Sequence, residues 1–272
     1  LTHMPRLQKE FFEQNETLDD SIAPFRELTS GAVDTLLRIS MRRSERWRKM
    51  KYDLKKDNEE IEESFFVPKE MTVFSWEGEI DTIMTPLDSM KYYKSFFRPG
   101  MMSMDPTNGY IKAWVGGMNY RHFQYDMVKK GKRQIGSTFK PFVYAAAIDQ
   151  LKLSPCDTFP DSQFCIEKNK FGNVEQWCPK NSGDKYGRTR TLKNALANSV
   201  NTVTARLMDR IGPRTVVKLA KDLGIEQRIL PVPSIALGTP DLSVYEMVAA
   251  YSTFANKGVY TQPVFIERIE DK

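Results

Sequence analysis

A short stretch near the middle of the chain places the strongest limit on its fold. A basic, glycine-punctuated segment, Lys129–Arg133, leads into Gly136-Ser137, and an apolar run then continues to Ile148. The basic segment predicts a loop, and the apolar run predicts a helix that starts near Ser137. We therefore expect a fold in which a loop delivers Ser137 to the beginning of a helix.

The spacing of Ser137 and Lys140 makes this helix start a candidate nucleophilic site. Residues three apart lie on the same face of a helix, so the hydroxyl and the amine can meet. A desolvated lysine has a lowered pKa and can take the proton of a serine nucleophile, while the helix N-terminus favours negative charge on a substrate. Taken alone the pattern is weak, because a helix-capping serine followed by an exposed lysine has the same spacing.

A second polar element, Ser199-Val200-Asn201, interrupts an otherwise helical pattern. A loop between two helices can direct both polar side chains into a cleft. Asn201 offers a donor and an acceptor to a peptide amide, and Ser199 can relay a proton beside a lysine. Serine and asparagine are also ordinary helix-break residues, so this element gains meaning only from its order after Ser137 and Lys140.

Composition excludes several classes of function. The chain has 272 residues, a net charge of +5 and 40% hydrophobic residues, enough for one large domain with an appendage. No run of about 18 apolar residues occurs that could span a membrane. The basic run Arg42–Lys51 is followed closely by five acidic residues, so we interpret it as a solvated helix face and expect no nucleic-acid partner.

The cysteines lie close together at Cys156, Cys165 and Cys178. With two histidines in the chain and no Cys-x-x-Cys, we expect no metal site. Cys165 and Cys178 flank a stretch that resembles a hairpin, so they are the candidates for a disulfide, which would indicate an oxidising compartment. Buried free thiols are the alternative.

The pattern of residues divides the chain near position 98. We expect residues 1–97 to be a mostly helical linker or pedestal with short strands, carrying no catalytic residues. Residues 98–272 then form a second domain. Besides the helix that starts near Ser137, its expected elements are a hairpin, an irregular excursion, three further helical stretches and a last strand, at Met101–Val115, Ser154–Arg190, 191–211, 213–224, 241–257 and Val259–Ile269.

Four blocks in this second domain resemble class A penicillin-binding proteins, most closely the 1A type. The blocks are Met104–Gly117, Lys132–Pro141, Thr191–Asn201 and, further on, Ala236–Gly238 with Met247–Tyr260. The first two motifs of that family are Ser-x-x-Lys and Ser-x-Asn in this order. The resemblance implies an α+β fold, the penicillin-binding and serine β-lactamase-like transpeptidase fold, in which helices flank an antiparallel sheet.

The same resemblance implies a peptidoglycan D,D-transpeptidase that needs no cofactor. Ser137 would attack the D-Ala-D-Ala stem peptide, Lys140 would take its proton, Ser199 would pass a proton to the leaving D-Ala, and Asn201 would hold the substrate amide. The implied partners are stem peptides, β-lactam antibiotics and other cell-wall synthesis proteins. The implied location is the periplasmic face of the bacterial inner membrane, with an anchor N-terminal to this chain.

One departure from the family pattern concerns its third motif. Lys-Thr-Gly, expected on a strand that lines the cleft, occurs nowhere in the 272 residues. We therefore expect a transpeptidase domain truncated before that strand and weakly active alone. A serine β-lactamase-like hydrolase and a non-catalytic sensor or scaffold of the same fold remain alternatives.

Overall fold

The computed structural model describes residues 2–13 and 28–270, which form two compact units. The first unit contains the chain up to Arg98 together with Met118–Gln124, and the second contains Pro99–Gly117 and the chain from Tyr125 onward. The short segment Met118–Gln124 lies within the range 98–272 expected for the second domain, but its contacts assign it to the first unit.

The first unit is built from helices and one hairpin. Its helices are α1 (Met4–Glu13), α2 (Ser30–Arg43), α3 (Glu45–Arg48), α4 (Asn58–Glu63) and α5 (Pro86–Ser95), with a π-helical turn, η1 (Lys49–Asp53). Helices thus predominate in this unit where the chain is described; residues 14–27 lie outside that part. Met41, Ile61 and Phe65 form a small buried core in this unit.

The hairpin of the first unit pairs β1 (Lys69–Ser75) with β2 (Gly78–Met84) in antiparallel register. Phe74 on β1 packs against Phe96 and Phe123 in an aromatic cluster. His122 joins the Tyr93 hydroxyl at 2.9 Å through Nδ1 and Glu79 at 2.8 Å through Nε2. These contacts hold the segment Met118–Gln124 on the first unit.

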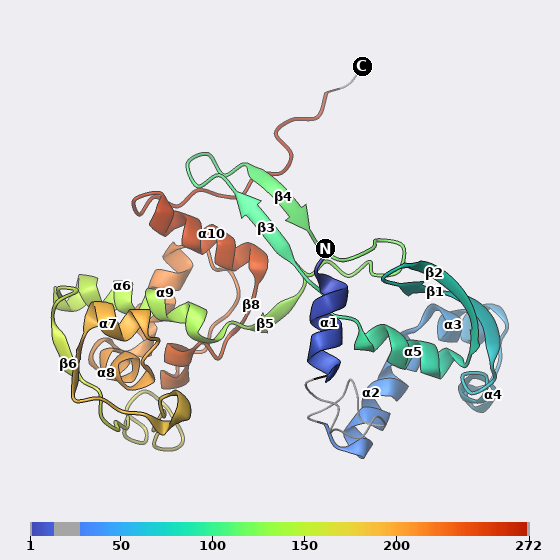
Figure 1. Ribbon diagram of the computed structural model, residues 1–272, viewed down its shortest axis with the longest axis horizontal. Coiled ribbons are helices and arrows are strands. Elements are labelled where there is room, and N and C mark those ends of the chain that lie inside the picture. The colour runs from blue at the N-terminus through green and yellow to red at the C-terminus, as the bar shows by residue number, and fades with distance from the viewer. Residues whose placement is uncertain (1, 14–27, 271–272) are drawn as a thin grey trace. The chain divides into compact units, whose positions relative to one another are not determined.

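The second unit begins with the predicted hairpin, β3 (Met101–Met104) and β4 (Ile111–Val115). The carboxylate of Asp105 accepts hydrogen bonds from the backbone and hydroxyl of Thr107, which closes the turn between the strands. Helix α10 (Val244–Ala255) packs beside β3 (Figure 1). The predicted turn and both strands of this hairpin are confirmed.

Helix α6 (Lys140–Leu151) lies in the core of the second unit. It packs against α7 (Leu192–Ala197), α8 (Asn201–Ile211) and α9 (Pro213–Asp222), which gather around it in Figure 1. Phe142, Val143 and Ala147 on α6 are fully buried. Other short elements of this unit are η2 (Gly136–Phe139), β6 (Thr158–Pro160), η3 (Ser182–Asp184), β7 (Thr189–Thr191) and η4 (Pro233–Leu237).

Part of the basic segment that was expected to be a loop is a strand. β5 (Lys132–Gln134) pairs antiparallel with β8 (Asp241–Ser243), although its side chains are exposed. The side chains of β5 thus remain exposed, while its backbone is hydrogen-bonded to β8. Helix α10 starts at Val244 rather than at Asp241, because the Ser243 and Glu246 side chains form a capping box that fixes the first turn there.

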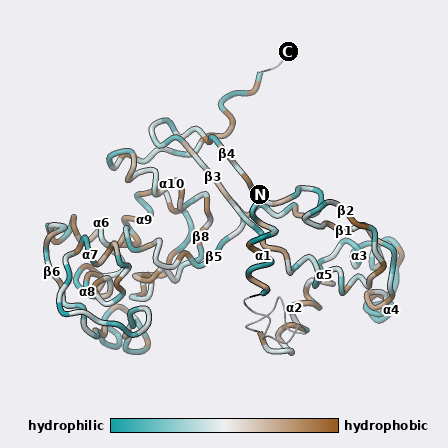
Figure 2. The backbone as a smooth tube through the Cα atoms, in the orientation of Figure 1, coloured by the Kyte–Doolittle hydropathy of each residue, from teal (hydrophilic) through white to brown (hydrophobic). Residues whose placement is uncertain are grey.

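The strand predicted over Val259–Ile269 is wrong. Within the described part of this segment, only Val264 is bridged to a strand neighbour, Tyr110. Pro263 has no N–H to donate, which limits strand pairing at its own position. Figures 1 and 2 show the segment as a tail without regular structure, in which hydrophilic and hydrophobic stretches follow one another. The mixture of helices and antiparallel strands nevertheless confirms the α+β fold class.

Candidate active site

Ser137 lies in a tight turn that precedes the core helix. The 3₁₀ turn η2 carries it, and α6 begins at Lys140. Ser137 is exposed, and within the described part of the chain its hydroxyl makes no hydrogen bond. The hydroxyl of its neighbour Thr138, in contrast, donates to the carbonyl of Ile135 at 2.6 Å. Ser137 is therefore the hydroxyl of this turn that is open to a substrate.

The backbone of Gly238 packs directly against the turn that carries Ser137. Gly136 has a φ of +56° and Gly238 a φ of +74°. The Gly136 N–H donates to the Gly238 carbonyl at 2.9 Å, and a Cβ at position 238 would lie 1.7 Å from the Gly136 oxygen. The segment Ala236–Gly238, singled out in the sequence without a role, thus packs against the turn that carries Ser137.

Lys140 is buried although it is charged in its ordinary state. Its exposed fraction is 1%. The amine donates to the Ser199 carbonyl at 2.5 Å, to the Ser199 hydroxyl at 2.9 Å and to Asn201 Oδ1 at 2.6 Å. Burial lowers the pKa of Lys140 to about 8, because desolvation disfavours the charged form. A fraction of this lysine is therefore neutral near physiological pH and can accept a proton.

Ser199 sits at the break between α7 and α8. Its φ of +53° lies in the left-handed region, which is costly for a residue with a Cβ. The N–H groups of Ser199 and Val200 donate to the carbonyls of Leu196 and Ala195, which fixes the turn. This conformation turns both the carbonyl and the hydroxyl of Ser199 toward the Lys140 amine.

Asn201 is the first residue of α8, and both the oxygen and the nitrogen of its side-chain amide are hydrogen-bonded. Oδ1 accepts from Lys140, and Nδ2 donates to the Lys180 carbonyl at 2.7 Å. Each end keeps capacity for another bond, since a carbonyl oxygen has two lone pairs and the NH₂ group has two hydrogens. Asn201 can therefore hold Lys140 and still offer a hydrogen bond to a substrate.

The structure brings together three of the four predicted catalytic and binding residues by direct hydrogen bonds. Lys140, Ser199 and Asn201 form one cluster, and the backbone N–H of Lys140 donates to the Ser137 carbonyl at the end of the η2 turn. In the described part of the chain no hydrogen bond joins the Ser137 hydroxyl to the Lys140 amine, which donates to Ser199 and Asn201 instead. Among the described residues, no three His, Cys, Asp or Glu side chains are grouped as a metal site requires.

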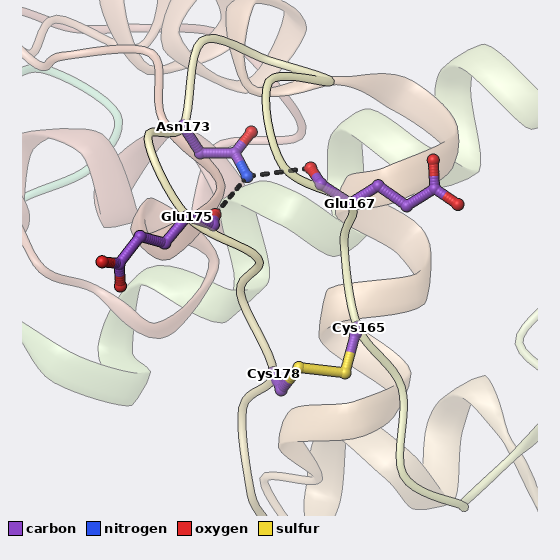
Figure 3. Close-up of a disulfide and its surroundings, with 5 residues drawn as sticks. All are labelled: Cys165, Glu167, Asn173, Glu175 and Cys178. Carbon is purple, nitrogen blue, oxygen red and sulfur yellow. Dashed lines mark hydrogen bonds between the residues drawn. A yellow bond between two sulfur atoms is a disulfide. The ribbon is translucent and has the colours of Figure 1, made fainter.

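Cys165 and Cys178 are joined by a disulfide, whereas Cys156 is free and exposed. Figure 3 shows the disulfide linking the two arms of a hairpin, with Asn173 bonding the carbonyls of Glu167 and Glu175 nearer its tip. The base of the hairpin is anchored by the buried Ile166, which is bridged to Trp177. The arm that ends at Cys178 continues directly to Lys180, the partner of Asn201.

Sequence reasoning missed Asp161 and Asn181. Both lie in the irregular excursion Ser154–Arg190, where no periodicity marks a buried residue. Asp161 is nevertheless fully buried and bonded to Asn181, whose side chain also contacts the start of α8. An isolated Asp between Pro160 and the polar pair Ser162-Gln163 gives no local signal of this role.

Comparison with known proteins agrees with this geometry. The family model of the penicillin-binding protein transpeptidase domain matches residues 99–272, and that of the penicillin-binding protein middle domain matches residues 20–97.

The chain belongs to the penicillin-binding protein transpeptidase family.

Relatives within this penicillin-binding protein family cover the same share of the chain. Penicillin-binding protein 1A of Aquifex aeolicus is 35% identical over 174 residues, which are 63% of this chain and 23% of that protein. Penicillin-binding protein 2D of Bacillus subtilis is 35% identical over 173 residues, 63% of this chain and 25% of that protein. The crystal structure of penicillin-binding protein 1A from Haemophilus influenzae matches with a TM-score of 0.59 and 31% identity, covering 63% of this chain and 25% of that one.

The chain therefore spans about a quarter of the length of these penicillin-binding proteins. The resemblance found in the sequence and the fold that it implied are both confirmed by these matches. In the part of the chain that the structure describes, no helix has the length and apolar character needed to cross a bilayer.

Proposed function

We propose that this chain carries the catalytic serine site of a peptidoglycan D,D-transpeptidase. The observation that supports the proposal most directly is the buried Lys140 amine, bonded to Ser199 and Asn201 one helical turn after the exposed Ser137. Membership of the penicillin-binding protein transpeptidase family supports the same acyl-transfer chemistry.

In this proposal, Ser137 is the nucleophile and Lys140 its general base. The Ser137 oxygen forms a bond to the carbonyl carbon of the D-Ala-D-Ala peptide bond, and its proton passes to the neutral amine of Lys140. The carbon–nitrogen bond then breaks, and Ser199 relays a proton to the nitrogen of the leaving D-Ala. An amine of a second stem peptide attacks the resulting ester, forms the cross-link and restores the Ser137 hydroxyl.

Asn201 is assigned the role of binding the substrate's amide backbone, because its side chain can still donate and accept one more hydrogen bond. The same proposal makes β-lactams covalent ligands of Ser137 and makes other cell-wall synthesis proteins the natural partners. It places the chain on the extracytoplasmic face of the inner membrane, held by a segment N-terminal to it. The disulfide Cys165–Cys178 supports an oxidising compartment.

We expect the 272-residue chain to acylate slowly. A Lys-Thr-Gly strand would supply an oxyanion-hole amide across the cleft, and the sequence contains no such motif. The loss of one oxyanion-hole donor costs about 3 kcal/mol in the transition state. Rapid stoichiometric labelling by a penicillin would contradict this part of the proposal.

The test is the intact mass of the chain during a long incubation with benzylpenicillin. We expect one covalent adduct that forms slowly and persists, as a transpeptidase predicts. An adduct that turns over would favour a serine β-lactamase-like hydrolase instead. Absence of any adduct, in the unaltered chain as in Ser137→Ala, would favour a non-catalytic sensor or scaffold.

A further inference from the structure

Asp161 is a buried carboxylate that stands outside the proposed chemistry. Its exposed fraction is 0%, and it is surrounded by donors from four positions in the chain. Oδ1 accepts from Asn181 Nδ2 at 2.7 Å and from the Thr202 hydroxyl at 2.8 Å. Oδ2 accepts from Arg190 Nε at 2.6 Å and from the Gly187 N–H at 3.0 Å. Each bonded donor offsets part of the cost of burying this group.

The ionised form of Asp161 is the one that these bonds stabilise. Burial raises the pKa of the carboxyl, but the hydrogen bonds from Arg190, Thr202, Asn181 and Gly187 outweigh it, so the pKa lies below its ordinary value. The carboxylate is therefore a fixed negative charge at neutral pH. It orients the Asn181 amide, because Nδ2 must point toward Asp161 and Oδ1 must point away from it.

The Oδ1 atom of Asn181 is the acceptor for the first backbone N–H groups of α8. It receives the Asn201 N–H at 3.0 Å and the Thr202 N–H at 3.2 Å. Such groups have no partner inside their own helix and are usually capped by the residue at the N-cap. The N-cap residue here is Val200, whose side chain cannot accept, so Asn181 caps α8 from a different part of the chain.

This cap acts on the residue that contacts Lys140. Asn201 is held by its N–H on Asn181 and by Nδ2 on the neighbouring Lys180 carbonyl, and its Oδ1 receives Lys140 at 2.6 Å. Hydrogen bonds thus connect Asp161, Asn181, Asn201 and Lys140 in sequence. The carboxylate and the amine are linked through groups that fix position and do not exchange protons.

We propose that Asp161 and Asn181 are positioning residues of the transpeptidase site, which hold Asn201 and through it the Lys140 amine where it can serve Ser137. This rests on the proposed function of Lys140 as general base. Misplacing a catalytic group by about 1 Å can cost 10²-fold in rate, so a rigid support for Asn201 has a direct kinetic consequence.

The test compares Asn181→Ala with Asn173→Ala. Asn173 is a matched control, because its side chain also bridges backbone groups of the excursion but bonds only inside the disulfide hairpin. Two quantities are measured: the initial rate of Ser137 acylation by benzylpenicillin as a function of pH, and the titration of Lys140 in the unacylated chain by side-chain carbon NMR.

We expect Asn181→Ala to lower the acylation rate by about 10-fold to 100-fold. We also expect its Lys140 titration midpoint at lower pH than in the unaltered chain, because a buried ammonium loses a well-placed acceptor. Asn173→Ala should change neither quantity beyond about twofold in rate. Equal rates in the two variants, or a Lys140 midpoint that is unchanged or higher in Asn181→Ala, would overturn the proposal.

A second pair of variants avoids any general unfolding of the excursion. Thr202→Val keeps the shape of the fully buried Thr202 but removes its hydrogen bond to Asp161, and Thr202→Ser keeps that bond. We expect Thr202→Val to lower the acylation rate about fivefold, as the loss of one hydrogen bond predicts, and Thr202→Ser to restore it. Equal rates in this pair would count against Asp161 as a positioning residue.

Failure of the proposed function gives a different result. If the unaltered chain formed no Ser137 adduct, the transpeptidase assignment would fall. If the unaltered chain formed the adduct and the Asn181→Ala variant formed it equally fast, only the positioning role would be contradicted.

Discussion

Lys140 and Ser199 are 59 positions apart in the sequence, yet the Lys140 amine donates to both the carbonyl of Ser199, at 2.5 Å, and its hydroxyl, at 2.9 Å. The left-handed backbone of Ser199 turns both oxygens toward this one amine. The lysine is thereby held at a fixed place beside the η2 turn, and its burial shifts its protonation toward the neutral form.

The first prediction concerns pH. The pKa of Lys140 is lowered to about 8, so the neutral amine that can accept the Ser137 proton increases as pH rises through that value. The rate of acylation by benzylpenicillin should increase from pH 6 to about 8 and level off above it. Quenched reactions analysed by intact mass give the profile, and circular dichroism over the same range controls for unfolding.

A flat profile over that range would mean that no group of such pKa acts as base. A midpoint near the ordinary value of 10.5 would mean that Lys140 is not desolvated in solution.

The second prediction separates the backbone of Ser199 from its hydroxyl. Ser199→Ala and Ser199→Gly both remove the relay hydroxyl, so both should lower the acylation rate by about 10²-fold. Glycine accepts the φ of +53° without strain, so Ser199→Gly should be more stable than Ser199→Ala by about 1 kcal/mol. Urea unfolding gives this difference. A more stable alanine variant would contradict the strained turn.

The third prediction concerns the contact between Gly238 and the turn that carries Ser137. A Cβ at Gly238 would lie 1.7 Å from the Gly136 oxygen, so Gly238→Ala must displace the backbone that carries Ser137. We expect a loss of at least about 3 kcal/mol of unfolding free energy, together with loss of acylation.

The control for this change is Gly172→Ala. Gly172 has a similar φ of +77°, but a Cβ there would meet no atom within 4 Å. It should therefore show only the cost of the left-handed backbone, about 1–2 kcal/mol, with acylation retained. Equal losses in the two variants would show that the Gly136–Gly238 contact contributes nothing.

The fourth prediction concerns the disulfide. Replacing Cys165 and Cys178 with serine should cost about 3 kcal/mol, because the unfolded chain regains the freedom of the closed loop. Thermal unfolding with and without reductant measures the same effect on the unaltered chain. Cys156→Ser serves as the control, since Cys156 is exposed and free. Melting temperatures that reductant leaves unchanged would argue against the Cys165–Cys178 bond.

Sequence reasoning could identify the residues of the candidate site because they lie in short motifs. Ser137 and Lys140 are three apart, and Ser199 and Asn201 are two apart, so a single local pattern contains each pair. The hairpin Met101–Val115 and the helices were predictable for the same reason, since hydrophobic periodicity and turn residues are local signals.

Features that depend on distant contacts could not be predicted. The cap that Asn181 provides for α8 and the packing of Gly238 on Gly136 join segments separated by many residues. β5 was interpreted as a loop because its three residues are all polar, and its pairing with β8 becomes visible only in the fold. The segment from Val259 to Ile269 has strand-like composition, but in the described chain it makes a single strand bridge, at Val264.

The most direct test of the account is to locate the adduct formed with benzylpenicillin by peptide mapping in the unaltered chain, in Ser137→Ala and in Thr138→Ala. Thr138 is the matched control, since it is the neighbouring exposed hydroxyl of the same turn. We predict an adduct on Ser137 in the unaltered chain and in Thr138→Ala, and none in Ser137→Ala. An adduct that persists in Ser137→Ala, or one that maps to another residue, would contradict the assignment of Ser137 as the nucleophile.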